Sequence, residues 1–174
     1  MVDGLNAAMM RAAAALKLQS TGELVKRCET MVAELKEKDR EIASLNSKLA
    51  GSRTGELLQN AQRVNGVVLL TASMSGMTPE MLRTMGDKLR DQEPAICALL
   101  CGGDEQKQTF YCVAGPEAVK AGVHAGRIIK EACAVTGGKG GGRPDSAMGG
   151  VGDTFKVDEA MSILDDLVKG MTAK

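Results

Sequence analysis

Residues 136–152 read Thr136-Gly137-Gly138-Lys139-Gly140-Gly141-Gly142-Arg143-Pro144-Asp145-Ser146-Ala147-Met148-Gly149-Gly150-Val151-Gly152. Eight residues from Gly137 to Gly152 are glycine, so this backbone can adopt positive φ and come close to another chain or a ligand. Successive exposed peptide N–H groups form concave anion sites. Lys139 and Arg143 add positive charge, and the planar guanidinium of Arg143 suits phosphate. The stretch therefore predicts a phosphate-binding loop, with a flexible linker as the alternative.

The spacing of this stretch differs from two common nucleotide-binding motifs. Neither Ser nor Thr follows Lys139, as a Walker A loop requires, and the glycines do not form a dinucleotide fingerprint after a strand. Residues 137–150, Gly-Gly-Lys-Gly-Gly-Gly-Arg-Pro-Asp-x-Ala-x-Gly-Gly, resemble the signature of the DHHA1 domain in the C-terminal part of alanyl-tRNA synthetases. DHH-family phosphoesterases carry a related, shorter glycine motif.

Composition limits the kinds of protein this can be. The 174 residues suit one domain of about 110 residues plus an appendage. Aromatic residues make up only 2% of the chain, which disfavours stacking of several bases on aromatic platforms. The formal net charge is zero, so any affinity for nucleic acid has to come from a local patch. We expect no membrane span, because no apolar run approaches the required length of about 18 residues.

Such a patch lies around the glycine stretch. Five basic residues stand between positions 120 and 143 against one acidic residue, Glu131. The basic residues are Lys120, Arg127, Lys130, Lys139 and Arg143. This asymmetry fits a small surface facing a polyanion, although an ordinary solvated face is the alternative.

The cysteines and the single histidine favour neither a disulfide framework nor a metal site. The five cysteines lie in apolar surroundings without CxxC or Cys/His ligand spacing. An odd number of cysteines without a secretory leader indicates reduced thiols and a cytoplasmic location. His124 fits a surface or hydrogen-bonded role better than a catalytic one.

The N-terminal third is predicted to be helical. A first helix covers residues 3–18, and Ser20 and Glu23 form a capping box for a second. The second helix carries a heptad stripe: Leu24, Cys28, Met31, Leu35, Ile42, Leu45 and Leu49. Such a stripe needs a cover, either the first helix in an antiparallel hairpin, which we favour, or the same helix of another copy. Glycines at 51 and 55 predict its end, and so a helical subdomain at 1–55 and a globular one at 56–174.

The globular part alternates apolar runs with helical patterns. Runs at 67–72, 95–101 and 109–114 predict strands, the last two pairing as a hairpin. Thr78-Pro79-Glu80 opens a helix to about residue 92, and further helices are expected over 115–135 and 157–169. A fourth strand is expected around 151–155. The fold class is therefore α+β or α/β, with helices packed on a small sheet.

The resemblance to the alanyl-tRNA synthetase C-terminal part extends over nearly the whole chain. Val67-Val68-Leu69-Leu70, Leu82-Arg83-x-x-x-Asp87-Lys88-Leu89 and the segment 121–130 follow the family's order. It implies a helical subdomain that supports homodimers in many members, and a DHHA1-like subdomain that binds the elbow of tRNA, here tRNA for alanine. It also implies upstream catalytic and editing domains as partners, which use ATP, magnesium and zinc. Two residues depart from the family's pattern: Met148 stands where the family usually has Gln, and Val151 interrupts the last glycine cluster.

The sequence lacks the class II ATP-binding motifs and the zinc cluster of an editing site, so we expect no catalytic residue and no cofactor in this chain itself. Alternative functions are a helical dimerisation module and the substrate-binding fragment of a DHH-type phosphoesterase, although His124 alone gives too few metal ligands for the latter. The predicted tRNA-binding residues are Gly138, Lys139, Gly140, Gly141, Gly142, Arg143, Lys120, Arg127 and Lys130.

Overall fold

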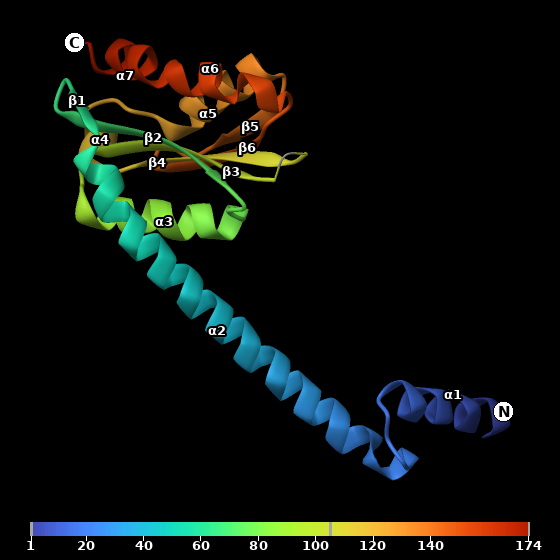
Figure 1. Ribbon diagram of the computed structural model, residues 1–174. Coiled ribbons are helices and arrows are strands. Elements are labelled where there is room, and N and C mark those ends of the chain that lie inside the picture. The colour runs from blue at the N-terminus through green and yellow to red at the C-terminus, as the bar shows by residue number, and fades with distance from the viewer. Residues whose placement is uncertain (1, 105, 174) are drawn as a thin grey trace. The chain divides into compact units, whose positions relative to one another are not determined.

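A computed structural model of the chain describes residues 2–104 and 106–173, which fall into two compact units on either side of Leu45. The first unit contains helix α1 (Val2–Ala15), the short 3-10 turn η1 (Thr21–Glu23) and the beginning of helix α2 (Leu24–Gln59) (Figure 1). The second unit contains the rest of α2, the sheet and the remaining helices. The predicted fold class, N-terminal helices followed by a small domain of sheet and helices, is confirmed.

The heptad stripe of α2 is only partly covered within this chain. Leu24 and Met31 are half-buried, whereas Leu35, Ile42 and Leu45 are 62%, 54% and 52% exposed; the side chain of Leu49 lies outside the described residues. Helix α1 is too short to cover the whole stripe in any arrangement, because its 14 residues span about 21 Å and the 36 residues of α2 about 54 Å. Helix α1 therefore leaves this part of the predicted stripe uncovered.

The second unit is built on a six-stranded mixed sheet with the order β1-β2-β3-β4-β6-β5. Strands β2 and β3 are parallel, and the other neighbouring pairs are antiparallel. The strands are β1 (Gln62–Val64), β2 (Val67–Ser75), β3 (Ile96–Gly103), β4 (Gln108–Ala114), β5 (Lys139–Gly142) and β6 (Ser146–Gly150). The predicted pairing of the second and third apolar runs is confirmed as the β3–β4 hairpin.

Helices cover both faces of this sheet (Figure 1). Helix α3 (Pro79–Gln92) packs Leu82, Met85 and Leu89 on one face. Thr78 caps it as predicted, with its hydroxyl accepting from the Met81 N–H at 3.3 Å. The other face carries α4 (Pro116–Lys120), α5 (Ala125–Thr136), η2 (Thr154–Lys156), α6 (Val157–Ser162) and α7 (Leu164–Thr172). The unit therefore has three layers with a core on each side of the sheet.

Five local predictions were wrong, and tertiary packing explains most of them. Ser20 precedes η1, but its side chain makes no capping hydrogen bond, so the predicted capping box is not formed. Helix α2 continues through residues 51–55, since Thr54 is buried there and Leu57 packs on the core. The helix expected over 115–135 is two helices, because Gly122 adopts φ +107° between them. The final helix divides into α6 and α7 at Ile163. The strand expected at 151–155 is irregular chain and the turn η2, because the glycine stretch itself supplies the missing strands.

No helix in the described residues is long and apolar enough to cross a membrane.

Candidate nucleic-acid interface

The glycine stretch forms a β-hairpin at the edge of the sheet, where a loop was predicted. Strand β5 is the outermost strand, pairs with β6 from Lys139↔Gly150 to Gly142↔Ala147, and all four of its residues are exposed. One edge of its backbone therefore has no neighbouring strand. The predicted nest of positive-φ residues is replaced by extended strands, since only Gly137 in the described stretch has positive φ, +71°, where it ends α5.

Most of these glycines are required by close packing. A Cβ on Gly140 would lie 2.5 Å from Gly149 Cα and 2.9 Å from Cys133 Sγ. A Cβ on Gly126 of α5 would collide with the carbonyl oxygen of Gly142. The hairpin and α5 thus approach each other to backbone distance. Gly141 differs, because a Cβ there would meet nothing within 4 Å and its φ needs no glycine.

The tip of the hairpin, residues 143–146, is fixed by backbone hydrogen bonds. The Arg143 N–H donates to Ser146 O at 2.9 Å, and the Ala114 N–H of β4 donates to Asp145 O at 2.9 Å. From the first turn of α5, the N–H groups of Ala125 and Gly126 donate to Pro144 O and Arg143 O. These α5 amides are therefore already occupied, and the tip holds Arg143 and Asp145 in place.

Between the hairpin and α3 lies an open groove of about 420 Å³. Arg83, Asp87, Arg90 and Tyr111 line one part of it, and the hairpin residues Gly141, Gly142, Arg143, Ser146, Ala147 and Met148 line the rest. Strand alternation accounts for Gly141, Arg143 and Met148, since the intervening residues Gly140 and Gly149 face Ile129 and Cys133 of α5. The groove is too small for a duplex and large enough for one nucleotide unit or a phosphate.

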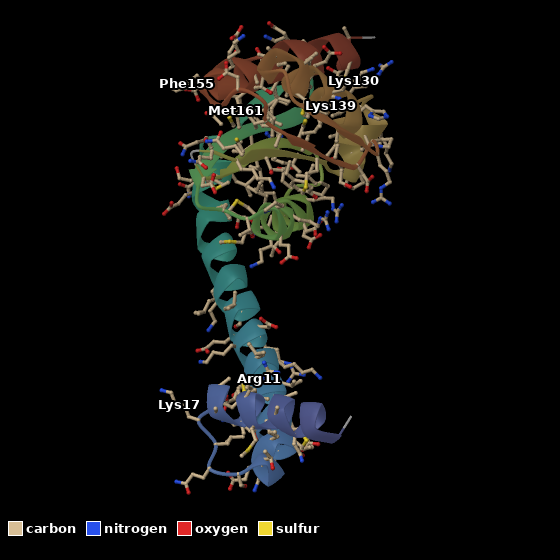
Figure 2. The ribbon with its side chains drawn as sticks, turned by 90° about the vertical axis from the view of Figure 1, so that its right-hand side faces the viewer. Arg11, Lys17, Lys130, Lys139, Phe155 and Met161 are labelled. Carbon is tan, nitrogen blue, oxygen red and sulfur yellow. The ribbon has the colours of Figure 1, made fainter. Side chains whose placement is uncertain are left out.

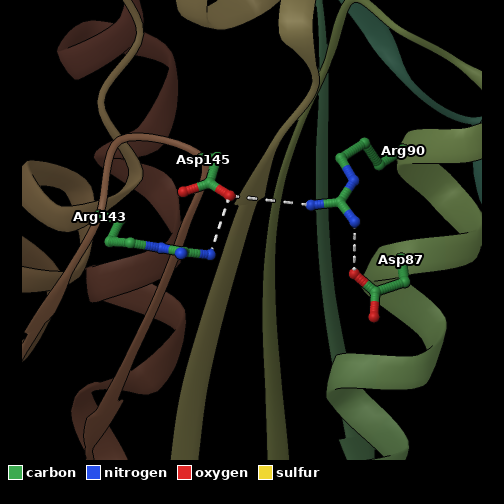
Figure 3. A network of polar contacts seen from close by, with 4 residues as sticks. All are labelled: Asp87, Arg90, Arg143 and Asp145. Carbon is green, nitrogen blue, oxygen red and sulfur yellow. Dashed lines mark hydrogen bonds and ion pairs between the residues drawn. The ribbon is translucent and has the colours of Figure 1, made fainter.

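Three charged residues of the groove, Asp87, Arg90 and Arg143, form one network with Asp145 at the hairpin tip (Figure 3). Arg90 Nη2 lies 2.9 Å from Asp87 Oδ1, and Arg90 Nη1 lies 4.0 Å from Asp145 Oδ2. Arg143 Nη2 lies 3.2 Å from the same Asp145 oxygen. The lining of the groove carries the guanidinium groups of Arg83, Arg90 and Arg143 and the carboxylate of Asp87, a net positive charge that favours an anion.

Tyr111 supplies a neutral hydroxyl at this site. Burial raises the pKa of Tyr111 above its ordinary value and the charge of Asp87 raises it further, while Arg90 and Arg83 oppose the shift. The phenol therefore stays protonated at neutral pH and can donate a hydrogen bond. Its ring packs against Gly86, where a Cβ would overlap it.

The predicted basic residues surround the hairpin from the other layer. Lys120 ends α4, Arg127 lies in the first turn of α5 and Lys130 one turn further along, all exposed. Figure 2 shows Lys130 and Lys139 among the side chains of the second unit. None of Lys120, Arg127, Lys130 and Lys139 forms an ion pair with another residue in the described ranges. These ammonium and guanidinium groups are therefore available to an external anion.

The structure thus separates the predicted site residues into two sets. Residues 138–143 belong to one hairpin, and only Arg143 among the predicted cations lines the groove, while Lys120, Arg127 and Lys130 lie on the α5 layer. Sequence reasoning missed Arg83, Arg90 and Tyr111. The spacing of Arg83, Asp87 and Arg90 at i, i+4 and i+7 places them on one helix face, a signal that could have identified the two arginines.

The surroundings of His124 and of the buried cysteines indicate structural roles. His124 caps α5, its Nδ1 accepting from the Arg127 N–H at 3.3 Å. Burial, assisted by the charge of Asp158, raises the pKa of the Cys101 thiol to about 11. Within residues 2–104 and 106–173, no group of three or more His, Cys, Asp or Glu side chains could hold a metal ion.

Comparison with known proteins places this geometry in a family. Residues 65–170 match the DHHA1 domain, and the chain belongs to the DHHA1 domain family. Its relatives include the alanine–tRNA ligase of Alkaliphilus oremlandii, 37% identical over 145 residues, which cover 83% of this chain and 16% of the ligase. That of Shouchella clausii is 34% identical over 161 residues, 92% of this chain and 18% of the ligase. The chain thus spans less than a fifth of these relatives.

Solved structures agree with this assignment. The chain is similar to the C-Ala domain of Aquifex aeolicus alanyl-tRNA synthetase, with a TM-score of 0.59 and 28% identity over 63% of this chain and 98% of that chain. RecJ of Thermus thermophilus shares the fold at a TM-score of 0.55 and 13% identity, covering 93% of this chain and 24% of RecJ. The recognition of the C-terminal part of alanyl-tRNA synthetase from the glycine motif is confirmed.

Proposed function

We propose that this chain is a non-catalytic tRNA-binding module that binds the elbow of tRNA, with tRNA for alanine as its physiological ligand. The observation that carries the proposal is the set of unpaired, exposed cations around the glycine hairpin, next to a groove lined by three arginines. Phosphate contacts from Lys and Arg provide most of the affinity of a protein for nucleic acid. The alanine–tRNA ligases among its relatives supply the class of RNA.

The shape of the site favours folded RNA. An edge strand with small residues lets a sugar-phosphate backbone approach closely, and the groove beside it accepts one exposed nucleotide unit. Cations on both layers can then contact phosphates on either side of the hairpin. A folded tRNA offers phosphates in a fixed arrangement, so shape should matter more than base identity. In this role the chain supports alanylation and editing by upstream domains of a cytoplasmic synthetase.

The proposal is tested by titrating the chain with three transcribed RNAs at two salt concentrations: tRNA for alanine, an unrelated tRNA and a linear RNA of equal length. We expect both tRNAs to bind more tightly than the linear RNA. The logarithm of the affinity should fall with the logarithm of the salt concentration, with a slope of about 0.9 for each phosphate that the protein neutralises. Equal affinity for the linear RNA, or binding that is independent of salt, would contradict the proposal.

A second candidate function, homodimerisation through α2, is favoured by the exposed stripe of Leu35, Ile42 and Leu45. These apolar side chains recur at heptad spacing, and burying a leucine or isoleucine contributes about 1.5–3 kcal/mol. A matching helix of a second copy would cover them.

We therefore expect the wild-type chain to sediment as a dimer at micromolar concentration and Ile42→Lys to sediment as a monomer. The matched control is Ser44→Lys, which adds the same charge at an exposed position of α2 outside the stripe. A monomeric wild type, or an equal loss of dimer in both variants, would refute dimerisation through this stripe.

A further inference from the structure

Asp145 lies at the tip of the hairpin, beside two of the arginines that line the groove. Its Oδ2 atom is 3.2 Å from Arg143 Nη2 and 4.0 Å from Arg90 Nη1, so one carboxylate oxygen faces two guanidinium groups from different layers (Figure 3). Arg143 belongs to the hairpin and Arg90 to α3. Both guanidinium groups line the groove.

The fold does not depend on this carboxylate. The hairpin tip is fixed by main-chain hydrogen bonds, including Ala114 N–H to Asp145 O and Arg143 N–H to Ser146 O. An asparagine at position 145 would keep these bonds and nearly the same shape. The side chains of Asp145 and Arg143 are also 41% and 77% exposed, and ion pairs this exposed are weak enough to exchange partners.

Carboxylate and phosphate oxygens compete for the same donors. A guanidinium fork binds either group through paired, charge-assisted hydrogen bonds. A phosphodiester entering the groove would therefore meet arginines that already hold an anion, and would have to take the place of that anion.

We propose that Asp145 is a built-in competitor for the ligand: its carboxylate holds Arg90 and Arg143 in the free protein, and a phosphodiester group of the bound RNA displaces it. The inference rests on the proposed RNA-binding function and adds to it the residue that limits affinity. Asp145 prevents the arginines from attracting any anion at full strength, so that only RNA with several simultaneous contacts binds well.

The first test compares tRNA binding by wild type and Asp145→Asn. We expect Asp145→Asn to bind about three- to tenfold more tightly at low salt, because the weak exposed pairs no longer have to be broken. Its log–log salt slope should steepen by up to about one. The matched control Asp166→Asn removes the same charge from an exposed position on α7 and should change affinity less than about twofold. In Arg143→Gln/Asp145→Asn the gain should largely disappear, as coupling between the two residues requires.

The second test does not need RNA. Inorganic phosphate is titrated while the amide signals of Gly141 and Gly142, which line the groove, are followed by NMR. We expect these signals to move at a lower phosphate concentration in Asp145→Asn than in wild type. Identical titrations, or no shift in either protein, would overturn the inference.

The outcomes separate the inference from the proposed function. If both proteins prefer tRNA to linear RNA but Asp145→Asn binds no more tightly than wild type, Asp145 is not a competitor and only the inference is lost. If neither protein prefers tRNA, the proposed function is lost. The phosphate titration then decides whether Asp145 competes with an anion at Arg90 and Arg143.

Discussion

Gly140→Ala is expected to lower the free energy of unfolding by about 1–3 kcal/mol, whereas Gly141→Ala, one residue further along β5, should leave it unchanged or raise it by up to about 1 kcal/mol. The two residues belong to the same edge strand, and neither has positive φ. Only the space around them differs. A Cβ on Gly140 would lie 2.5 Å from Gly149 Cα and 2.7 Å from Ile129 Cγ2, while one on Gly141 would meet nothing within 4 Å.

The physical reason lies in the nature of the neighbours. The backbone of β6 cannot move away from Gly140 without loosening the β5–β6 pairing, and Ile129 and Cys133 are fixed in the core. At Gly141 an added methyl group projects into the groove without meeting another atom. Its main effect is therefore to reduce the conformational entropy of the unfolded chain. Urea unfolding followed by far-UV circular dichroism measures both variants, with Gly141→Ala as the matched control. Equal stability of the two variants would mean that the packing of α5 against β5 does not require a strand without side chains.

Gly141→Ala has a second use, because we expect this variant to fold while it adds a methyl group to the lining of the groove. Neither packing nor φ requires glycine at position 141, so close approach of a ligand can be the reason for glycine there. If the glycines were present only for packing, an alanine at position 141 would be neutral for both stability and RNA affinity.

The sequence was sufficient to predict the centre of the sheet. The runs at 67–72, 95–101 and 109–114 are apolar and bounded by turn residues, so their composition predicts strands that are buried on both faces. The start of α3 could also be predicted, because Thr is favoured as the N-cap and Pro at the first position of a helix, and Thr78 and Pro79 occupy these positions. In these segments local preference and tertiary packing agree.

The glycine hairpin could not be predicted in this way. Glycine has low strand propensity and no apolar side chain to mark a buried face, so β5 and β6 carry no strand pattern. They are strands because β6 pairs with both β4 and β5 while α5 packs closely on them at Gly126 and Cys133, and no local signal encodes these contacts. The candidate site was only partly predictable, because some of its residues belong to the motif and others are brought to it by tertiary contacts. Lys139 and Arg143 could be identified from the motif itself. Arg90 joins the site only because β6 lies between β4 and β5 in the sheet, which brings the hairpin next to α3.

Arg90→Gln and Arg143→Gln should each weaken tRNA binding about tenfold, and Lys120→Gln no more than about threefold. Loss of a charge-assisted hydrogen bond to phosphate costs about 1.5–3 kcal/mol when the phosphate is partly desolvated, and a tenfold change corresponds to about 1.4 kcal/mol. Both arginines line the groove, whereas Lys120 is exposed at the end of α4. Filter binding at several salt concentrations measures the affinities and slopes together.

A conservative variant tells charge from geometry. Arg90→Lys keeps the positive charge but loses the planar fork, so it should keep the salt slope of wild type while losing part of the affinity. Arg90→Gln should lose about one unit of slope as well. Because Arg90 also pairs with Asp87 on α3, thermal unfolding of each variant must show that the domain is intact. If Lys130→Gln and Arg127→Gln proved more damaging than Arg90→Gln and Arg143→Gln, the RNA would have to lie on the α5 layer. The groove would then have no part in binding.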